Sequence, residues 1–319
     1  MQRTTLCAIA CLMAGLACLV TTQEEPGNAG ESPSYKVVHG WPALPDGYAL
    51  GQVTGVGVDS QNRVWVFHRA ERPVLCLDGD SGEIISSFGD DMFENEHGLA
   101  VDNLDNVWLT DADAHVVEQY SPEGELMMTL GIKGEPGEDE QRFNKPTDVD
   151  IAPDGSIYVT DGYGNNRVVK LSSDGKFITA WGSKGTGPGE FDTPHGLAID
   201  SDGRVYVADR GNSRVQVFDA DGTFITEWKS EEIGRPWGVD VTADGNIVVA
   251  DGGDLTGTAY DRNGALLMTP AGEILERWGS YGSHDGQFYW AHDIAAGGNG
   301  AVYVTDVNAG MRVQKFLRR

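Results

Sequence analysis

Apolar and polar residues alternate along most of this chain, in short segments separated by polar turns rich in Asp and Gly. A segment of this kind opens each of six similar units, which start at Thr54, His97, Thr147, His195, Trp237 and His292. A second alternating segment follows in each unit and, in most of them, ends at an Asp. Alternation with a period of two, bounded by Asp-Gly turns, predicts β-hairpins. No segment has a pattern that favours a helix.

The spacing of the units predicts the architecture. They begin roughly every 42–55 residues, and a period of this order with several short strands per unit is typical of β-propeller blades. We therefore predict an all-β fold, a six-bladed β-propeller. The sixth unit stops after its third strand, at residues 312–316, so we expect residues 35–39 to supply its outer strand. That closure would remove the free sheet edges of an open ring. The alternative is that residues 35–39 are only a connecting segment ahead of the first unit.

The first 20 residues have the pattern of a targeting segment. Arg3 gives a positive start and residues 6–20 form an apolar run, which is the order found in a signal peptide. Cys18 follows Ala17 and is a candidate lipidation site, so a lipoprotein signal and simple cleavage both stay open. Both predict an exported protein, periplasmic or extracellular, whose only membrane contact would be a lipid anchor on Cys18.

Residues 21–33 are polar and rich in Pro, Gly and Glu, a composition typical of a disordered linker. The propeller would then occupy residues 34–319. Three of the four cysteines lie in the targeting segment, which leaves Cys76 as the single cysteine of the folded domain. No disulfide can form within that domain, so its stability has to come from its core and from bound ions.

The charge balance limits the partners of the protein. The chain has 23 Lys and Arg against 49 Asp and Glu, a net charge of −26. Binding to nucleic-acid phosphates needs a basic surface, so we expect no nucleic-acid partner, and an anionic membrane surface is equally unfavourable. The sequence carries no signal for an oligomer, and we expect a monomer.

Histidine opens the second, fourth and sixth units, as His97, His195 and His292. Alternate blades of a six-bladed ring lie one third of a turn apart, so equivalent side chains from them would meet at the ring axis. Three imidazoles with a fourth position left open are the ligand set of a catalytic zinc ion. The alternative is that these histidines only pack, as residues at this position often do in repeat propellers.

A second set of reactive groups follows the end of the second strand in each unit. Arg69 and Arg210 occupy the position after the strand-ending residue, and Tyr163 lies one place beyond it in its unit. Guanidinium groups bind carboxylates in a bidentate manner, and a phenol beside cations is a candidate general base. If these loops fold over the axial mouth, the three side chains flank the metal. Taken singly, each is also explained as a surface arginine or a packing tyrosine.

The remaining histidines and acidic candidates are less informative. His68 replaces the strand-ending Asp of the first unit; we expect a solvated turn there, with a supporting role for the metal site as the alternative. His115 and His284 lie outside the repeat, and we expect both at the surface. Asp293 is a candidate ligand for a hard cation such as calcium. The tryptophans that recur on fourth strands are expected in the core: Trp181, Trp228 and Trp278.

Together these segments resemble the lyase half of peptidylglycine α-amidating monooxygenase, the peptidyl-α-hydroxyglycine α-amidating lyase family, from about Gly51 to the C-terminus. The segments that carry the resemblance are V-F-H-R (66–69), H-G-L-A-V-D (97–102), T-D-G-Y-G-N-N-R-V (160–168), T-P-H-G-L-A (193–198), V-A-D-R-G-N-S-R-V-Q (207–216) and A-H-D-I (291–294). The resemblance implies a six-bladed propeller of NHL-type repeats.

The resemblance also implies roles for individual residues. It implies three zinc ligands, a catalytic pair and a substrate-positioning arginine. In that order they are His97, His195 and His292, then Tyr163 and Arg210, and finally Arg69. It further implies a structural calcium ion held by the carboxylate of Asp293 and the backbone carbonyls of Val56 and Leu99.

The chain departs from the family in three respects. Trp290 stands where the family has a methionine two places before the third zinc histidine, which would narrow or reshape the substrate pocket. The family's disulfide cysteines are absent, and other residues stand at or near their places: Asn144, Gly164, Val205 and Val217. The copper monooxygenase half is missing from the 319 residues, so the hydroxylated substrate would have to come from another protein or another pathway.

The function expected from these features is that of a zinc-dependent lyase. It would cleave the C–N bond of an N-acyl- or peptidyl-α-hydroxyglycine and release a primary amide and glyoxylate. One alternative is a non-catalytic propeller that binds a peptide, glycan or protein at the cell surface. Another is a metal site acting on a different small substrate, as in sugar lactonases with calcium, but carboxylate and asparagine ligands would then be expected in place of histidine.

Overall fold

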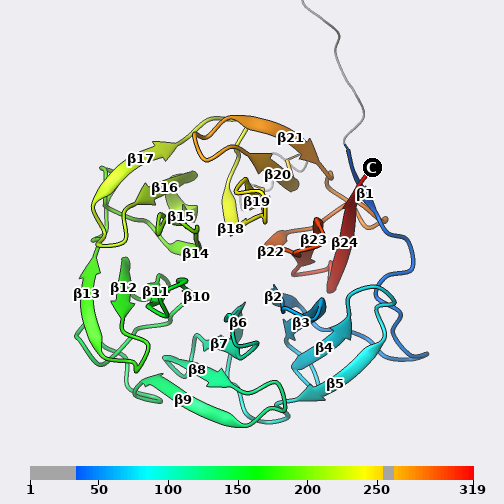
Figure 1. Cartoon of the computed structure of the whole chain (residues 1–319), viewed down its shortest axis with the longest axis horizontal. Coiled ribbons are helices and arrows are strands. Elements are labelled where there is room, and N and C mark those ends of the chain that lie inside the picture. The colour runs from blue at the N-terminus through cyan, green and yellow to red at the C-terminus, as the bar shows by residue number, and fades with distance from the viewer. Residues whose placement is uncertain (1–33, 254–261) are drawn as a thin grey trace, which may run out of the picture. The chain divides into compact units, whose positions relative to one another are not determined.

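In the computed structural model, which describes residues 34–253 and 262–319, six four-stranded antiparallel sheets surround a common axis (Figure 1). The predicted fold class, an all-β six-bladed propeller, is confirmed. The expected signal peptide and linker, residues 1–33, lie outside the described residues. No helix in the described part of the chain has the length and apolar character needed to cross a lipid bilayer.

Each of the first five blades is formed by four consecutive strands, ordered from the axis outward. Blades one and two consist of β2 (Val53–Val58), β3 (Arg63–His68), β4 (Val74–Asp78), β5 (Ile84–Phe88), β6 (Glu96–Val101), β7 (Val107–Asp111), β8 (Val116–Tyr120) and β9 (Leu126–Gly131). Blades three and four consist of β10 (Asp148–Ile151), β11 (Ile157–Asp161), β12 (Arg167–Leu171), β13 (Phe177–Trp181), β14 (Pro194–Ile199), β15 (Val205–Asp209), β16 (Arg214–Phe218) and β17 (Phe224–Trp228). Blade five consists of β18 (Pro236–Val241), β19 (Ile247–Asp251), β20 (Gly264–Met268) and β21 (Ile274–Trp278).

The sixth blade joins the two ends of the domain. Its strands, from the axis outward, are β22 (Ala291–Ala296), β23 (Ala301–Asp306), β24 (Arg312–Arg318) and β1 (Tyr35–Val37). Tyr35 pairs with Arg318 and Val37 with Phe316 in an antiparallel register, and the Tyr35 ring stacks on Trp278 of blade five at 4.5 Å. The N-terminal segment is therefore the closing strand, although it ends at Val37 and not at residue 39.

Burial follows the position of a strand in its blade. The second strand of each blade is almost wholly buried, because both of its faces pack against neighbouring blades, whereas the outermost strands are mostly exposed or partly buried. Two of the three expected core tryptophans, Trp228 and Trp278, are buried. Trp181 is only partly buried at the edge of the core between blades three and four.

The strand-ending aspartates attach the axial strands to their blades. Each carboxylate is buried and accepts a backbone N–H from the loop that enters the innermost strand, two or three residues before the position that opens the unit. The pairs are Asp111 with Asn95, Asp161 with Asn144, Asp209 with Asp192, Asp251 with Arg235 and Asp306 with Trp290, at 2.7–3.0 Å. The repeated Asp therefore helps to fix the position of each unit's first residue along the ring axis.

Two histidine expectations were wrong for the same physical reason. His68 was expected in a solvated turn, but it is fully buried, and its Nδ1 accepts the N–H of Gly51 at 3.3 Å. His115 was expected at the surface, but it is 9% exposed, and its Nδ1 accepts the N–H of Lys145 at 3.0 Å. Both rings accept a backbone N–H from the loop that precedes an innermost strand, as the strand-ending aspartates do. His284 is exposed, as expected.

Candidate functional site

Three imidazoles meet on the axis of the ring. His97 on β6, His195 on β14 and His292 on β22 are each less than 5% exposed, and their ring centroids lie 4.8–4.9 Å apart. One ring nitrogen from each lies within 4.8 Å of the other two. The alternation of histidine along the sequence thus becomes a three-fold cluster within reach of a single ion.

The other nitrogen of each ring is tied to the next blade. Every Nδ1 donates to the backbone carbonyl of the residue that opens the following unit. The acceptors for His97, His195 and His292 are Thr147, Trp237 and Thr54, at 2.5, 2.9 and 2.8 Å. Because a carbonyl only accepts, each Nδ1 carries the proton and each Nε2 presents its lone pair to the axis. This is the arrangement that orients metal-binding histidines in proteins.

The site keeps the imidazoles neutral. Burial, together with the positive charge of Arg69, lowers the pKa of His97 to about 3. Burial and the nearby Arg210 charge also hold the pKa values of His195 and His292 well below the usual range. Three neutral nitrogen donors without a carboxylate among them suit a borderline cation such as zinc and suit calcium poorly. The residues therefore fit the metal that the sequence predicts.

Tyr163 covers the open side of the histidine cluster. Its hydroxyl lies 2.9 Å from Nε2 of His97 and 3.2 Å from Nε2 of His195, and the ring is 38% exposed. Gly162 makes this approach possible, because a Cβ at that position would lie 1.8 Å from the Pro194 carbonyl oxygen. Any larger residue would push the loop, and the phenol with it, away from blade four.

Two arginines lie beside the cluster. Arg210 begins the short 3-10 helix η1 (Arg210–Asn212), and its Nη1 donates to the Tyr163 hydroxyl at 3.3 Å. Arg69 donates from Nε and Nη2 to the carbonyl of Glu96, at 3.2 and 3.1 Å, directly before His97. Neither guanidinium forms a salt bridge with a carboxylate of the described residues. Both charges are therefore available to an anionic ligand at the axial mouth.

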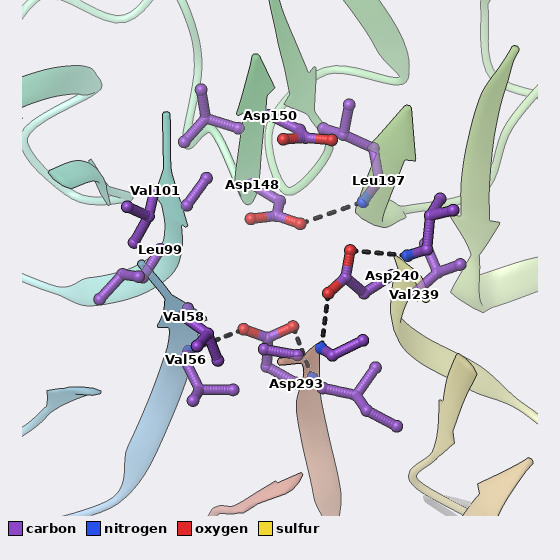
Figure 2. A pocket seen from close by; sticks show the side chains of 17 residues that line it. Val56, Val58, Leu99, Val101, Asp148, Asp150, Leu197, Val239, Asp240 and Asp293 are labelled. Carbon is purple, nitrogen blue, oxygen red and sulfur yellow. Dashed lines mark hydrogen bonds between the residues drawn. The ribbon is translucent and has the colours of Figure 1, made fainter. Parts of the chain in front are cut away.

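Four aspartates line a second cavity on the axis, about 190 Å³ in volume, which Figure 2 shows from close by. They are Asp148, Asp150, Asp240 and Asp293. Each carboxylate accepts a backbone N–H from the next blade, from Leu197, Ile199, Ala296 and Val56 respectively, at 2.7–3.0 Å. Asp148 and Asp293 border the histidine cluster as well, so the histidine cluster and the acidic cavity lie next to one another.

The residues implied for calcium come together in this cavity. Val56, Leu99 and Asp293 all line it (Figure 2), and they come from blades one, two and six, which are neighbours in the ring. The other three aspartates were not predicted. The signal for them is present in the repeat, since Asp148 matches Asp293 in the second position of the unit, while Asp150 and Asp240 share its fourth position.

Burial of these carboxylates makes the stability of the metal-free protein depend on pH. It raises the pKa of Asp150 to about 7 and that of Asp240 to about 6. A carboxyl group whose pKa is higher in the folded than in the unfolded protein binds its proton more tightly when folded. Its contribution to stability is complete below the unfolded pKa of about 4 and is lost as pH rises through the folded pKa. Asp150 and Asp240 should therefore each remove roughly 1–4 kcal/mol from the free energy of unfolding between about pH 4 and pH 7. His97, His195 and His292, whose pKa values folding lowers, contribute in the opposite direction over part of this range.

The Asp150→Asn variant should gain stability relative to wild type between pH 5 and pH 8, because asparagine does not ionise and the histidine contributions are the same in both proteins. Urea denaturation in the presence of a chelator, at pH 5 and pH 8, measures the difference. Asp46→Asn removes an exposed carboxylate and is the matched control. Equal pH dependence in wild type and Asp150→Asn would contradict the expectation.

The departures from the family have simple local explanations. Asn144 and Gly164 lie side by side, and a Cβ at 164 would fall 2.2 Å from the Asn144 Cγ. The amide side chain therefore occupies the space beside the glycine. Cys76 is free and buried, and burial raises its pKa to about 11. Trp290 lies 5.9 Å from Trp237, measured between ring centroids, and Trp237 in turn contacts His195 and His292.

The fold and the repeats together define a class of protein. The NHL repeat model matches residues 143–171 and 191–218, which contain the inner three strands of blades three and four. A gluconolactonase from Xanthomonas campestris has the same fold, with a TM-score of 0.63 and 18% identity over 91% of this chain and 96% of that one. The protein is a six-bladed propeller built from NHL-type repeats.

Sequence relatives narrow this class to a family. The chain is 32% identical to peptidyl-glycine α-amidating monooxygenase B of Xenopus laevis, over 84% of this chain and 34% of that protein. It is 33% identical to the probable peptidyl-α-hydroxyglycine α-amidating lyase of Caenorhabditis elegans, over 50% of this chain and 53% of that one. NHL repeat-containing protein 3 of Homo sapiens is 35% identical to this chain, over 56% of this chain and 54% of that protein.

The chain is thus a relative of the peptidyl-α-hydroxyglycine α-amidating lyases, and the resemblance stated from the sequence is confirmed. The matches span between 34% and 54% of the length of these curated relatives.

Proposed function

We propose that the protein is a zinc-dependent lyase that cleaves the C–N bond of N-acyl- or peptidyl-α-hydroxyglycine, releasing a primary amide and glyoxylate. The observation that carries the proposal is the Tyr163 hydroxyl, 2.9 Å from a histidine Nε2 and within hydrogen-bonding distance of Arg210. An ionised phenol beside three neutral imidazoles and two guanidinium groups, neither of which has a carboxylate partner among the described residues, can remove a proton from a bound hydroxyl. The name of the Caenorhabditis elegans relative, a probable peptidyl-α-hydroxyglycine α-amidating lyase, supports the same reaction.

The proposed site binds the substrate by its α-hydroxyglycine end. Arg69 pairs with the carboxylate in the fork geometry that guanidinium groups favour. His97, His195 and His292 would hold the zinc ion, which as a Lewis acid polarises oxygen atoms brought to it. The remaining acyl group then extends away from the axis, out of the channel mouth.

The reaction needs one proton to move. Tyr163, as the phenolate, accepts the proton of the α-hydroxyl and becomes a neutral phenol, and the electron pair of that O–H bond forms the carbonyl of glyoxylate. The C–N bond breaks at the same carbon, and its electron pair goes to the amide nitrogen. That nitrogen takes up a proton to give the primary amide, so the atoms balance without water or an oxidant. Arg210 stabilises the phenolate and the charge that develops in the transition state.

We propose a structural role for a calcium ion in the acidic cavity. The carboxylate of Asp293 and the carbonyls of Val56 and Leu99 are oxygen donors, which hard cations prefer. An ion shared by blades one, two and six would link the closing blade to its neighbours. It would also neutralise part of the charge of four aspartates in one cavity.

The test is cleavage of α-hydroxyhippurate by zinc-loaded protein, with glyoxylate measured as product. We expect turnover that disappears on chelation and returns when zinc is added. The His284→Ala variant, which changes an exposed histidine far from the repeat positions, is the control and should retain full activity. Folded, zinc-loaded protein that forms no glyoxylate from this compound or from hydroxyglycine-ended peptides would remove the proposal.

The second candidate function is that of a non-catalytic binding module at the cell surface. The 35% identity with NHL repeat-containing protein 3, whose name records no reaction, favours this alternative. Metal content separates the two functions. Purified protein that is folded but free of zinc, even after growth with added zinc, would support the binding module.

A further inference from the structure

In blade five, Trp237 occupies the position that histidine holds in blades two, four and six. It is 4% exposed, and its ring lies 5.3 Å from His195 and 5.4 Å from His292. The Arg210 guanidinium lies over it, with 4.5 Å between Cζ and the ring centroid. The same carbon lies 5.1 Å from the centroid of Tyr163. Arg210 is therefore held between two aromatic rings at the edge of the histidine cluster.

Arginines elsewhere in this chain are held differently. In blade four, the buried Arg214 on β16 forms a salt bridge with Asp209 at 2.8 Å. In blade three, Arg167 forms one with Asp161 at 3.0 Å. Among the described residues Arg210 has no carboxylate partner, and its buried Nε has no hydrogen-bond partner. In a chain with 49 acidic residues, its position depends on ring contacts and on one bond to the Tyr163 hydroxyl.

The sequence of blade five makes room for this arrangement. Gly252 holds the position that is arginine in blades one and four, and a Cβ there would lie 2.6 Å from the Trp237 Nε1. The indole fills the space that a side chain at residue 252 would take. Trp290 lies 5.9 Å away, between ring centroids. Trp237 is thus packed into a single position, and it presents one face to the guanidinium.

We propose that Trp237 and Tyr163 form an aromatic slot that positions Arg210 as an uncompensated cation beside the reacting atoms. This inference rests on the proposed lyase function and makes Trp237 a positioning residue for it. An aromatic face attracts a guanidinium without neutralising it, whereas a carboxylate would cancel its charge. The slot therefore orients Arg210 and preserves its field for the anionic transition state.

The test compares Trp237→Phe with Trp237→Leu on α-hydroxyhippurate. Phenylalanine keeps an aromatic face and should retain most of kcat, whereas leucine, similar in apolar character, should lower kcat by about 3- to 30-fold. KM should change little, since Arg210 acts on charge that develops in the transition state. Active wild type with equal kcat for Trp237→Leu overturns the slot. Wild type that forms no glyoxylate at all refutes the lyase function instead.

Chemical rescue tests the slot more directly. Low millimolar guanidinium should restore part of the activity of Arg210→Ala, because the ion can enter the space between the two rings. It should not rescue Arg210→Ala combined with Trp237→Leu, and equal rescue of both would overturn the proposal.

One readout does not depend on activity. In ¹⁵N-labelled protein the Arg210 Nε–H resonance, assigned by its loss in Arg210→Lys, should be shifted upfield by the ring current and return towards its ordinary position in Trp237→Leu. An unshifted resonance in the wild type would show that the slot does not form.

Discussion

Replacement of His195 by alanine should remove both zinc and activity. The imidazole supplies one of three nitrogens that share a centre, and two nitrogens do not retain zinc against a chelator. Loss of groups that merely support a metal ligand costs roughly 10–100-fold in affinity, so loss of the ligand itself should exceed this. Elemental analysis of purified protein, together with glyoxylate release, measures the effect.

Two controls separate metal binding from folding in this experiment. His284→Ala should keep zinc near one per chain, because that side chain is exposed and lies outside the cluster. The melting temperature of metal-free His195→Ala, compared with metal-free wild type, shows whether the fold is intact. A folded His195→Ala variant with a full complement of zinc would contradict the site as described.

Tyr163→Phe should abolish most of the turnover and keep the metal. The change removes only a hydroxyl, and a positioned general base contributes typically about 10²–10⁴-fold to a rate. We expect kcat to fall by this order while zinc content and KM stay close to wild type, because the three histidines and Arg69 are unchanged. Steady-state kinetics with α-hydroxyhippurate and elemental analysis give both quantities.

The matched control is Tyr48→Phe, which removes a hydroxyl that has no hydrogen-bond partner among the described residues. It should leave kcat unaltered. Wild-type kcat in Tyr163→Phe would show that another group accepts the proton. Loss of zinc in that variant would show that the phenol is needed to hold the ion.

Most of the fold could be predicted because each blade repeats the same pattern of strands and turns. Alternating strands and Asp-Gly turns are local signals, and the missing fourth strand of the last unit indicated the closing segment. The structure adds what the strand-ending aspartates do. Their carboxylates reach back to the loop before the innermost strand, and this long-range contact is invisible in a local pattern. His68 and His115 were misjudged because an imidazole can accept the same backbone N–H.

The site was predictable where it follows the symmetry of the ring. Strict alternation places His97, His195 and His292 around one axis, so spacing alone brings them together. Asp150 and Asp240 follow the repeat as well, but a carboxylate in a turn-rich acidic chain does not stand out from its neighbours. The contact of Trp237 with Arg210 could not be predicted, since it depends on the direction of a loop side chain.

The hydrogen bonds from the histidine Nδ1 atoms have a mechanical consequence. The three histidines come from even-numbered blades, and each is hydrogen-bonded to the odd-numbered blade that follows it, so all six blades would help to hold a bound ion. Displacement of any single sheet would be transmitted to the centre. Metal release and global unfolding should then occur as one cooperative event. The metal content of the protein would therefore indicate whether the whole propeller is folded.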